Sequence, residues 1–82
     1  MSQSEICKKE LLLRLGKNIR ELRIQQGVSQ EELAFKIDSA RNFIGCIERA
    51  EKSPTIFTLF RIARALNVKL EILVKGIDNF PH

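Results

Sequence analysis

Arg41 and Asn42 are adjacent at the start of the segment RNFIGCIERA, and both side chains can form paired hydrogen bonds. A guanidinium donates two parallel hydrogen bonds, which fit the O6 and N7 acceptors of guanine. A carboxamide donates one hydrogen bond and accepts another, which fits N6 and N7 of adenine. The pair is therefore suited to reading base edges in DNA, provided that a helix presents both residues at its tip.

The helices that would position this pair are predicted from apolar residues at three- and four-residue spacing. The first runs from about Lys9 to Gln26, and Gly27 ends it. The second opens at Ser29, because Ser29 and Glu32 form the pattern of a capping box. The residues expected to face the core in these two helices are Leu12, Leu15, Ile19, Leu22, Leu33 and Ile37, with the small Ala34 beside them.

The third predicted helix carries the Arg41–Asn42 pair. A break at Asp38 and Ser39 precedes it, and we expect about ten residues of helix after that break. Its tip would be Ala40, Arg41 and Asn42, its inward side Ile44 and Ile47, and its edge Phe43, for which a place in the core is the alternative.

Two more helices are predicted after the segment KSPT. Ser53 or Thr55 is the expected N-cap of the fourth helix, which reaches about Leu66. The fifth runs from about Leu70 to Lys75, with an edge strand over NVKLEILV as the alternative. Both helices hold more apolar residues than one small core can use, which indicates an interface between two copies of the chain. These residues are Ile56, Phe57, Phe60, Leu70, Leu73, Val74 and Ile77.

Length and composition limit the classes of function. A chain of 82 residues builds one small domain. We expect its core over about residues 12–77, with mobile ends at 1–8 and 78–82. The sequence has no nucleophile elbow, Gly-rich phosphate loop or carboxylate cluster, so we expect no enzyme and no cofactor. The two cysteines lack a paired spacing, which predicts free thiols and no metal site.

The sequence also favours a cytoplasmic protein. Its longest apolar run has three residues, Leu11 to Leu13, far short of a membrane span.

The net charge is +4, with +3 over residues 1–28, −1 over 29–54 and +2 over 55–82. Such a balance suits a nucleic-acid partner but is common in other domains, so charge does not decide the function.

The segment SQEELAFKIDSARNFIGCIERAEKSPT resembles the Cro/repressor-type (XRE-like) helix-turn-helix family of phage and bacterial regulators. The resemblance extends over about Leu15 to Leu73 and includes the closing segment LFRIARALNV. The Arg–polar–aromatic–Ile tip is most similar to that of small restriction–modification controller proteins. This resemblance implies an all-α, five-helix, lambda-repressor-like domain in which the second and third helices bind DNA.

The resemblance also implies roles for individual residues. The implied protein is bacterial or phage-encoded and binds a palindromic double-stranded operator as a homodimer. RNA polymerase is a candidate partner. Arg23 and Glu48 correspond to a semi-buried salt bridge. The implied base-reading residues are Arg41, Asn42, Phe43, Cys46 and Ala40, and the implied phosphate-binding residues are Gln30, Arg49, Lys52 and Ser53.

Other interpretations stay open at this point. Gln30 could be an ordinary surface residue, and Cys46 a passive small residue or a redox-sensitive thiol. An antitoxin-type autoregulator and a protein–protein adaptor without DNA affinity are the alternative functions. The basic residues of the first helix form either a solvated face or a second DNA contact; they are Lys8, Lys9, Arg14, Lys17 and Arg20.

The sequence departs from the family pattern at three positions. Asp38 replaces the usual Gly of the turn, and Asp tolerates a positive φ better than most residues. Ser39 replaces an apolar turn residue. Ala50 stands where Gly or Asn usually ends the third helix, and a left-handed Ala costs about 1 kcal/mol. We therefore expect the third helix to continue toward Glu51.

Overall fold

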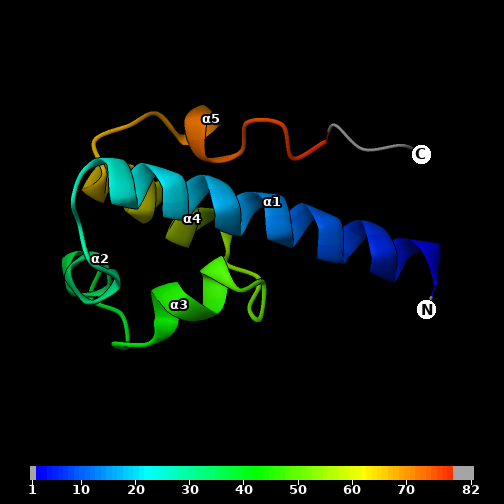
Figure 1. Ribbon diagram of the computed structural model, residues 1–82, viewed down its shortest axis with the longest axis horizontal. Helices are drawn as coiled ribbons and strands as arrows, with labels where there is room; N and C mark the ends of the chain where they lie inside the picture. Colours follow the sequence, from blue (N-terminus) through cyan, green and yellow to red (C-terminus); the bar gives the residue numbers. More distant parts are fainter. Residues whose placement is uncertain (1, 79–82) are drawn as a thin grey trace.

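The computed structural model describes residues 2–78, without the side chains of residues 3–6, and this part of the chain folds into five helices (Figure 1). They are α1 (Gln3–Gln25), α2 (Gln30–Lys36), α3 (Phe43–Glu48), α4 (Ile56–Ala65) and α5 (Leu70–Leu73). No strand occurs within residues 2–78, so the all-α prediction is confirmed and the edge strand is wrong. Residues 79–82 of the expected tail lie outside the described residues.

Helix α1 is longer than its apolar pattern predicted, because it begins at Gln3 and not near Lys9. No Gly or Pro interrupts this early segment, whereas the apolar spacing marks only the part of the helix that packs on the core. Leu15 and Ile19 lie in that part and are buried. The N-terminal part of α1 extends past α2, α3 and α4 (Figure 1).

Helices α1 and α3 touch closely at Gly16. A Cβ atom on this residue would lie 2.7 Å from the carbonyl oxygens of both Ile47 and Glu48. Because these are backbone atoms, no rotamer change could relieve the clash. Glycine therefore lets α1 rest directly on the last turn of α3.

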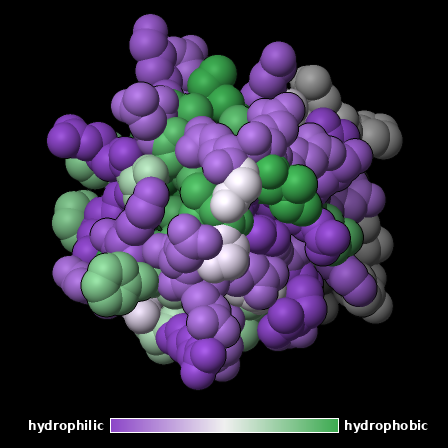
Figure 2. All heavy atoms as spheres, turned by 60° about the vertical axis from the view of Figure 1, so that its left-hand side comes forward, coloured by the Kyte–Doolittle hydropathy of each residue, from purple (hydrophilic) through white to green (hydrophobic). Residues whose placement is uncertain are grey.

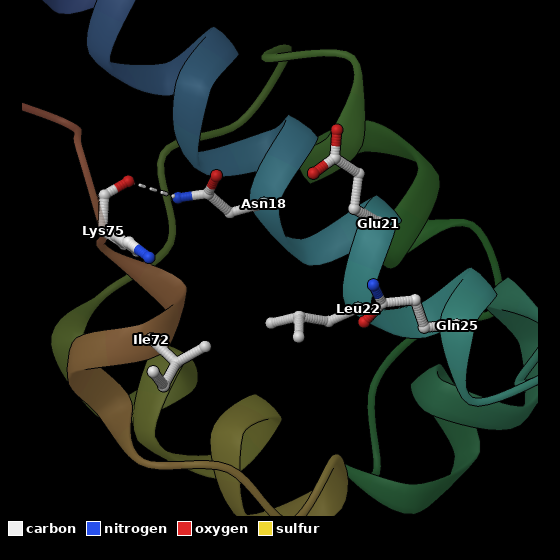
Figure 3. Close-up of a pocket in the computed structure, with 6 residues that line it drawn as sticks. All are labelled: Asn18, Glu21, Leu22, Gln25, Ile72 and Lys75. Atoms are coloured by element: carbon white, nitrogen blue, oxygen red, sulfur yellow. Dashed lines mark hydrogen bonds between the residues drawn. The ribbon is translucent and has the colours of Figure 1, made fainter.

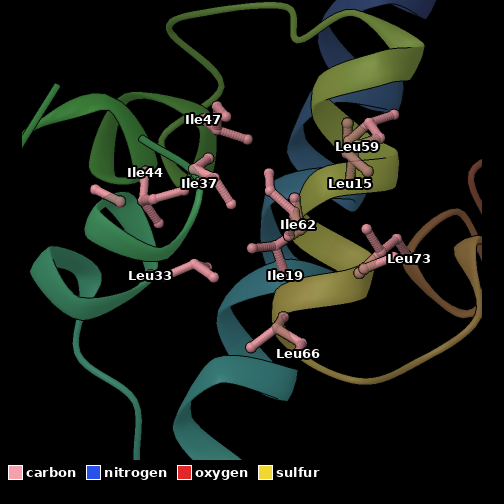
Figure 4. Close-up of a cluster of buried hydrophobic side chains, with 12 residues drawn as sticks. Leu15, Ile19, Leu33, Ile37, Ile44, Ile47, Leu59, Ile62, Leu66 and Leu73 are labelled. Carbon is pink, nitrogen blue, oxygen red and sulfur yellow. The ribbon is translucent and has the colours of Figure 1, made fainter. Parts of the chain in front are cut away.

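The hydrophobic core lies where all five helices meet (Figure 4). Every residue predicted to face inward from α2 and α3 is at most 2% exposed. Leu12 and Leu22 of α1 are only half-buried. Burial of each Leu or Ile side chain contributes about 1.5–3 kcal/mol. The buried residues are Leu15, Ile19, Leu33, Ala34, Ile37, Ile44, Ile47, Leu59, Ile62, Ala63, Leu66 and Leu73.

The predicted capping box opens α2. The Glu32 backbone N–H donates to Ser29 Oγ at 3.0 Å, and the Ser29 backbone N–H donates to Glu32 Oε1 at 3.2 Å. The turn after α2 places Asp38 at φ 53°, the left-handed conformation that Asp was expected to tolerate. Ser39 keeps the turn tied to α2, because its backbone N–H donates to the Ala34 carbonyl at 2.9 Å.

Helix α3 is shorter than predicted at both ends. It spans six residues, because residues 40–42 form a turn before it. The expectation that it continues toward Glu51 is wrong, since Ala50 adopts φ 60° and ends it. The N–H groups of Ala50 and Glu51 donate to the carbonyls of Ile47 and Cys46 at 3.0 and 2.8 Å. This Schellman pattern satisfies the last carbonyls of the helix and offsets the cost of a left-handed Ala.

Helices α4 and α5 complete the fold. Thr55, and not Ser53, caps α4, since Thr55 Oγ1 accepts from the Thr58 backbone N–H at 3.1 Å. Helix α5 is a single turn and ends before the predicted Lys75. Asn18 of α1 replaces the missing helical bonds. Its Nδ2 donates to the Leu73 carbonyl at 2.8 Å and to the Lys75 carbonyl at 2.9 Å (Figure 3). A cavity of about 150 Å³ lies beside this contact, between α1 and α5.

Candidate nucleic-acid interface

Helix α3 is held by its inward side and leaves its tip in solvent. Ile44 and Ile47 are 0% and 1% exposed and anchor the helix in the core. Ala40, Arg41 and Asn42 precede the helix and are all exposed. The tip thus projects from a fixed base, as a group that reads a ligand by shape and hydrogen bonding requires.

A buried ionic network fixes the C-terminal end of α3. Arg23 of α1 donates from Nε and Nη2 to the two carboxylate oxygens of Glu48, at 2.7 and 3.1 Å. The side chains are 11% and 3% exposed. Arg23 Nη1 also donates to the Val28 carbonyl at 2.9 Å, and Gln30 Nε2 donates to Glu48 Oε1 at 3.0 Å. This is the ion pair that the resemblance implied, and it joins α1, α2 and α3.

The N-terminal end of α3 carries an exposed ion pair. Arg41 Nη2 donates to Glu31 Oε1 of α2 at 2.9 Å, and the two side chains are 80% and 62% exposed. Asn42 is the N-cap of α3, yet its side chain makes no capping hydrogen bond. Its amide therefore remains available for an external partner.

A second exposed pair follows the helix. Arg49 donates from Nε and Nη2 to the two carboxylate oxygens of Glu51 at 2.9 and 3.2 Å. These hydrogen bonds lower the pKa of Glu51 and raise the pKa of Arg49. Arg49 Nη2 also lies 3.9 Å from Cys46 Sγ. Lys52 and Ser53 follow and are exposed.

The arrangement of two short helices with an exposed tip on the second agrees with a comparison of the sequence with family models. A model described as helix-turn-helix matches residues 19–73. The chain belongs to this helix-turn-helix family. The predicted family and fold are thereby confirmed.

This helix-turn-helix protein is similar to several named regulators and to solved structures. Control protein C.SmaI of Serratia marcescens is 35% identical over 81 residues, 96% of each chain. The HTH-type transcriptional regulator y4dJ of Sinorhizobium fredii is 33% identical over 82% of this chain and 87% of the relative. The crystal structure of the restriction-modification controller protein C.AhdI from Aeromonas hydrophila has a TM-score of 0.74 at 34% identity, over 76% of this chain and 94% of that one.

These likenesses make the chain a helix-turn-helix transcriptional regulator with controller proteins among its relatives. The predicted resemblance to restriction–modification controllers is confirmed in this sense. Within residues 2–78, no helix is long and apolar enough to cross a membrane. The same residues hold no group of three metal-ligating side chains.

Three of the predicted contact residues are less exposed than the tip of this helix-turn-helix. Gln30 is half-buried, and its amide nitrogen is engaged with Glu48. Phe43 is half-buried and packs against the core, as its alternative interpretation stated. Cys46 is half-buried and a free thiol, like Cys7. Their contacts with DNA stay predictions.

The residues predicted for the dimer surface differ in their exposure. Ile56, Phe57 and Phe60 of α4 are 68%, 65% and 46% exposed. Arg61 and Arg64 lie over the rings of Phe57 and Phe60, at 5.9 and 5.7 Å from the ring centres. By contrast, the predicted interface residues of α5 and of the turn after it pack on the core of their own chain. Leu73 is 0% exposed and cannot contribute its side chain to an interface, whereas three others are half-buried: Leu70, Val74 and Ile77.

Sequence reasoning missed three exposed residues of interest. Glu31 lies ten positions before Arg41, so no helical spacing indicated their contact. Phe35 of α2 is 83% exposed and Ile72 of α5 is 40% exposed. The α2 side of the molecule is mostly hydrophilic, with separate apolar groups between polar side chains (Figure 2). The exposure of Phe35 could have been predicted only from its position, because it is an apolar residue that lies outside the inward-facing side of α2.

Proposed function

We propose that this regulator binds a specific double-stranded DNA operator and reads its bases with Arg41 and Asn42. The observation that carries the proposal is the contrast at α3, where a buried base supports an exposed Arg–Asn tip. In a helix-turn-helix, residues at the start of the second helix contact base edges in the major groove. Arg and Asn are the side chains whose hydrogen bonds discriminate guanine and adenine best.

The surrounding residues support the same orientation on DNA. Arg49, Lys52 and Ser53 lie just beyond the C-terminal end of α3, where the adjacent phosphates would pass. Arg49 would exchange Glu51 for a phosphate, and Gln30 would contact a phosphate through the part of its amide that Glu48 leaves free. Phosphate contacts of this kind fix the register of the protein without reading sequence.

The regulator acts as a homodimer in this proposal. One α3 tip contacts too few base pairs to select a single site in a genome. The exposed apolar residues Ile56, Phe57 and Phe60 of α4 offer a surface for a second copy. Two-fold pairing would place two α3 helices about 34 Å apart, which matches a palindromic operator.

The regulated system is proposed from the relatives. C.AhdI is named as a restriction-modification controller protein, and C.SmaI as a control protein. The chain covers nearly the whole length of both. A role as controller of a restriction–modification system is therefore the function that we favour among those open to a small helix-turn-helix regulator.

Selection of bound duplexes from a random library tests the DNA proposal. We expect a palindromic consensus whose two halves are centred about one helical turn apart, and affinity that falls steeply as salt rises. Enrichment of no sequence at low salt would refute it. An adaptor would show no duplex affinity at any salt concentration.

Sedimentation of the unmodified chain and of Phe57→Ser tests the assembly. Phe57 is exposed, so this substitution should leave the fold intact. We expect a dimer for the unmodified chain, and a monomer with weakened operator binding for the variant. A monomer at micromolar concentration in the unmodified chain, with full affinity for a single half-site, would contradict the homodimer.

A further inference from the structure

The two exposed arginines beside α3 hold their carboxylates in different ways. Arg49 gives Glu51 two hydrogen bonds, from Nε and Nη2. Arg41 gives Glu31 one, from Nη2 alone at 2.9 Å. A guanidinium has five N–H donors, so these two pairs leave different donors for an external partner.

We propose that Glu31 is a positioning residue, which holds Arg41 so that its free donor edge faces a guanine in the operator. The inference rests on the proposed function, because it assigns Arg41 to base reading. It adds a residue on α2 that reads no base itself but sets the geometry of one that does.

The donor geometry allows Glu31 and a guanine to be bound together. Nη2 carries two hydrogens, one on each of the two donor edges of the guanidinium. A carboxylate on one of these hydrogens leaves the other edge complete, with one hydrogen of Nη2 and one of a neighbouring nitrogen. Two parallel donors are what the O6 and N7 acceptors of guanine require. Arg41 therefore need not release Glu31 in order to read a base.

Glu31 is itself held in place. It lies in the first turn of α2, whose start is fixed by the Ser29–Glu32 capping box. One residue before it, Gln30 ties α2 to the buried Glu48. A carboxylate on a fixed stretch of backbone reduces the number of rotamers that the long Arg41 side chain adopts before DNA arrives, and ordering a side chain in advance lowers the cost of binding.

The carboxylate also makes Arg41 a poorer general ligand for phosphate. The Arg41–Glu31 pair has no net charge, so it gains little from the field of the DNA backbone. A hydrogen bond to a guanine is directional and persists beside a carboxylate. Glu31 thus raises the share of binding energy that depends on sequence.

A double-mutant cycle on the selected operator tests this role. Binding is measured for the unmodified chain, Glu31→Gln, Arg41→Ala and the double variant, on the operator and on an unrelated duplex. We expect Glu31→Gln to weaken operator binding about tenfold in the presence of Arg41 and to cause no loss once Arg41 is Ala, as coupled neighbours show. On the unrelated duplex the same variant should bind as well as the unmodified chain or up to about threefold better.

Glu21→Gln is the matched control for charge. Glu21 is exposed, pairs with Lys17 at 3.9 Å and lines the cavity between α1 and α5 (Figure 3). This control should change binding to both duplexes by one and the same small factor. Glu31→Gln should unfold at the same temperature as the unmodified chain, because the ion pair that it removes is exposed.

The outcomes separate this inference from the proposed function. If Glu31→Gln strengthens binding to both duplexes equally, Glu31 only masks Arg41 and the inference is wrong, whereas the DNA proposal stands. The same conclusion follows if the loss is equally large with Ala at position 41. A chain that selects no sequence overturns both proposals.

Discussion

The two ends of α3 use the same chemistry for different purposes. At its C-terminal end, Glu48 is 3% exposed and shares two hydrogen bonds with Arg23. At its N-terminal end, Arg41 is 80% exposed and shares one with Glu31. A buried pair cannot be broken without stranding a charge, whereas an exposed pair exchanges readily with water. An arginine–carboxylate pair thus holds α3 in place at one end of the helix, and at the other end we propose that it faces the DNA.

Removal of the buried Glu48 carboxylate should cause the largest change in stability at either end of α3. Glu48→Ala leaves Arg23 without its partner in a site that is 11% exposed, and Gln30 loses its acceptor. We expect a loss of about 3–5 kcal/mol in the free energy of unfolding, measured by urea denaturation. Glu51→Ala, which breaks an exposed pair, is the control and should cost less than about 1 kcal/mol. Equal losses would remove the distinction between a buried pair and an exposed one.

Truncation of the tip should have the opposite signature. Arg41→Ala and Asn42→Ala are each expected to weaken operator binding by about 1–3 kcal/mol while binding to unrelated DNA changes little. The free energy of unfolding should stay within about 0.5 kcal/mol of its original value, because both side chains are exposed. Titration of operator and unrelated duplexes gives the two affinities. An equal loss on every duplex would assign these residues to the DNA backbone.

A smaller change is expected where α3 ends. Ala50 adopts φ 60°, a conformation that glycine adopts without steric cost. Ala50→Gly should therefore raise the free energy of unfolding by up to about 1 kcal/mol, measured by thermal or urea denaturation. The matched variant Ala40→Gly, at an exposed position without a positive φ, should not stabilise the chain. If both variants destabilise it equally, the strain at Ala50 is negligible.

The smallest effect concerns pH. The Arg49 hydrogen bonds lower the pKa of Glu51 in the folded chain, so the folded state favours the charged carboxylate. The resulting stabilisation is complete above the ordinary pKa of 4.5 and is lost as the pH falls below it through the lowered value. The difference in stability between the unmodified chain and Glu51→Gln should therefore shrink as the pH falls from above 4.5 through the lowered pKa of Glu51. A difference that is constant over this range would exclude the pair as its source.

The sequence was most informative where one local rule decides the structure. Ser29 and Glu32 predicted the start of α2, and the apolar spacing predicted the buried residues of α2 and α3. The Arg23–Glu48 pair came from the family resemblance, because no spacing rule connects residues that lie 25 positions apart.

The sequence was least informative where tertiary contacts override local preference. Ala50 is a poor left-handed residue, yet the hydrogen bonds of the Schellman pattern hold it there. Helix α5 ends at Leu73, and Asn18, far away in the sequence, donates to the carbonyls of Leu73 and Lys75. Leu73 looked like surplus apolar surface, but it is part of the core. The role of Glu31 depends on a turn whose geometry the residue types do not determine.

The contact at Gly16 has a mechanical consequence. Side chains usually separate the backbones of two packed helices. At Gly16 no side chain does so, and α1 touches the backbone of α3 directly. The same helix extends well beyond the rest of the described fold at its N-terminal end (Figure 1). A displacement of α1 would therefore pass at Gly16 directly to the last turn of α3, whose other end follows Arg41 and Asn42.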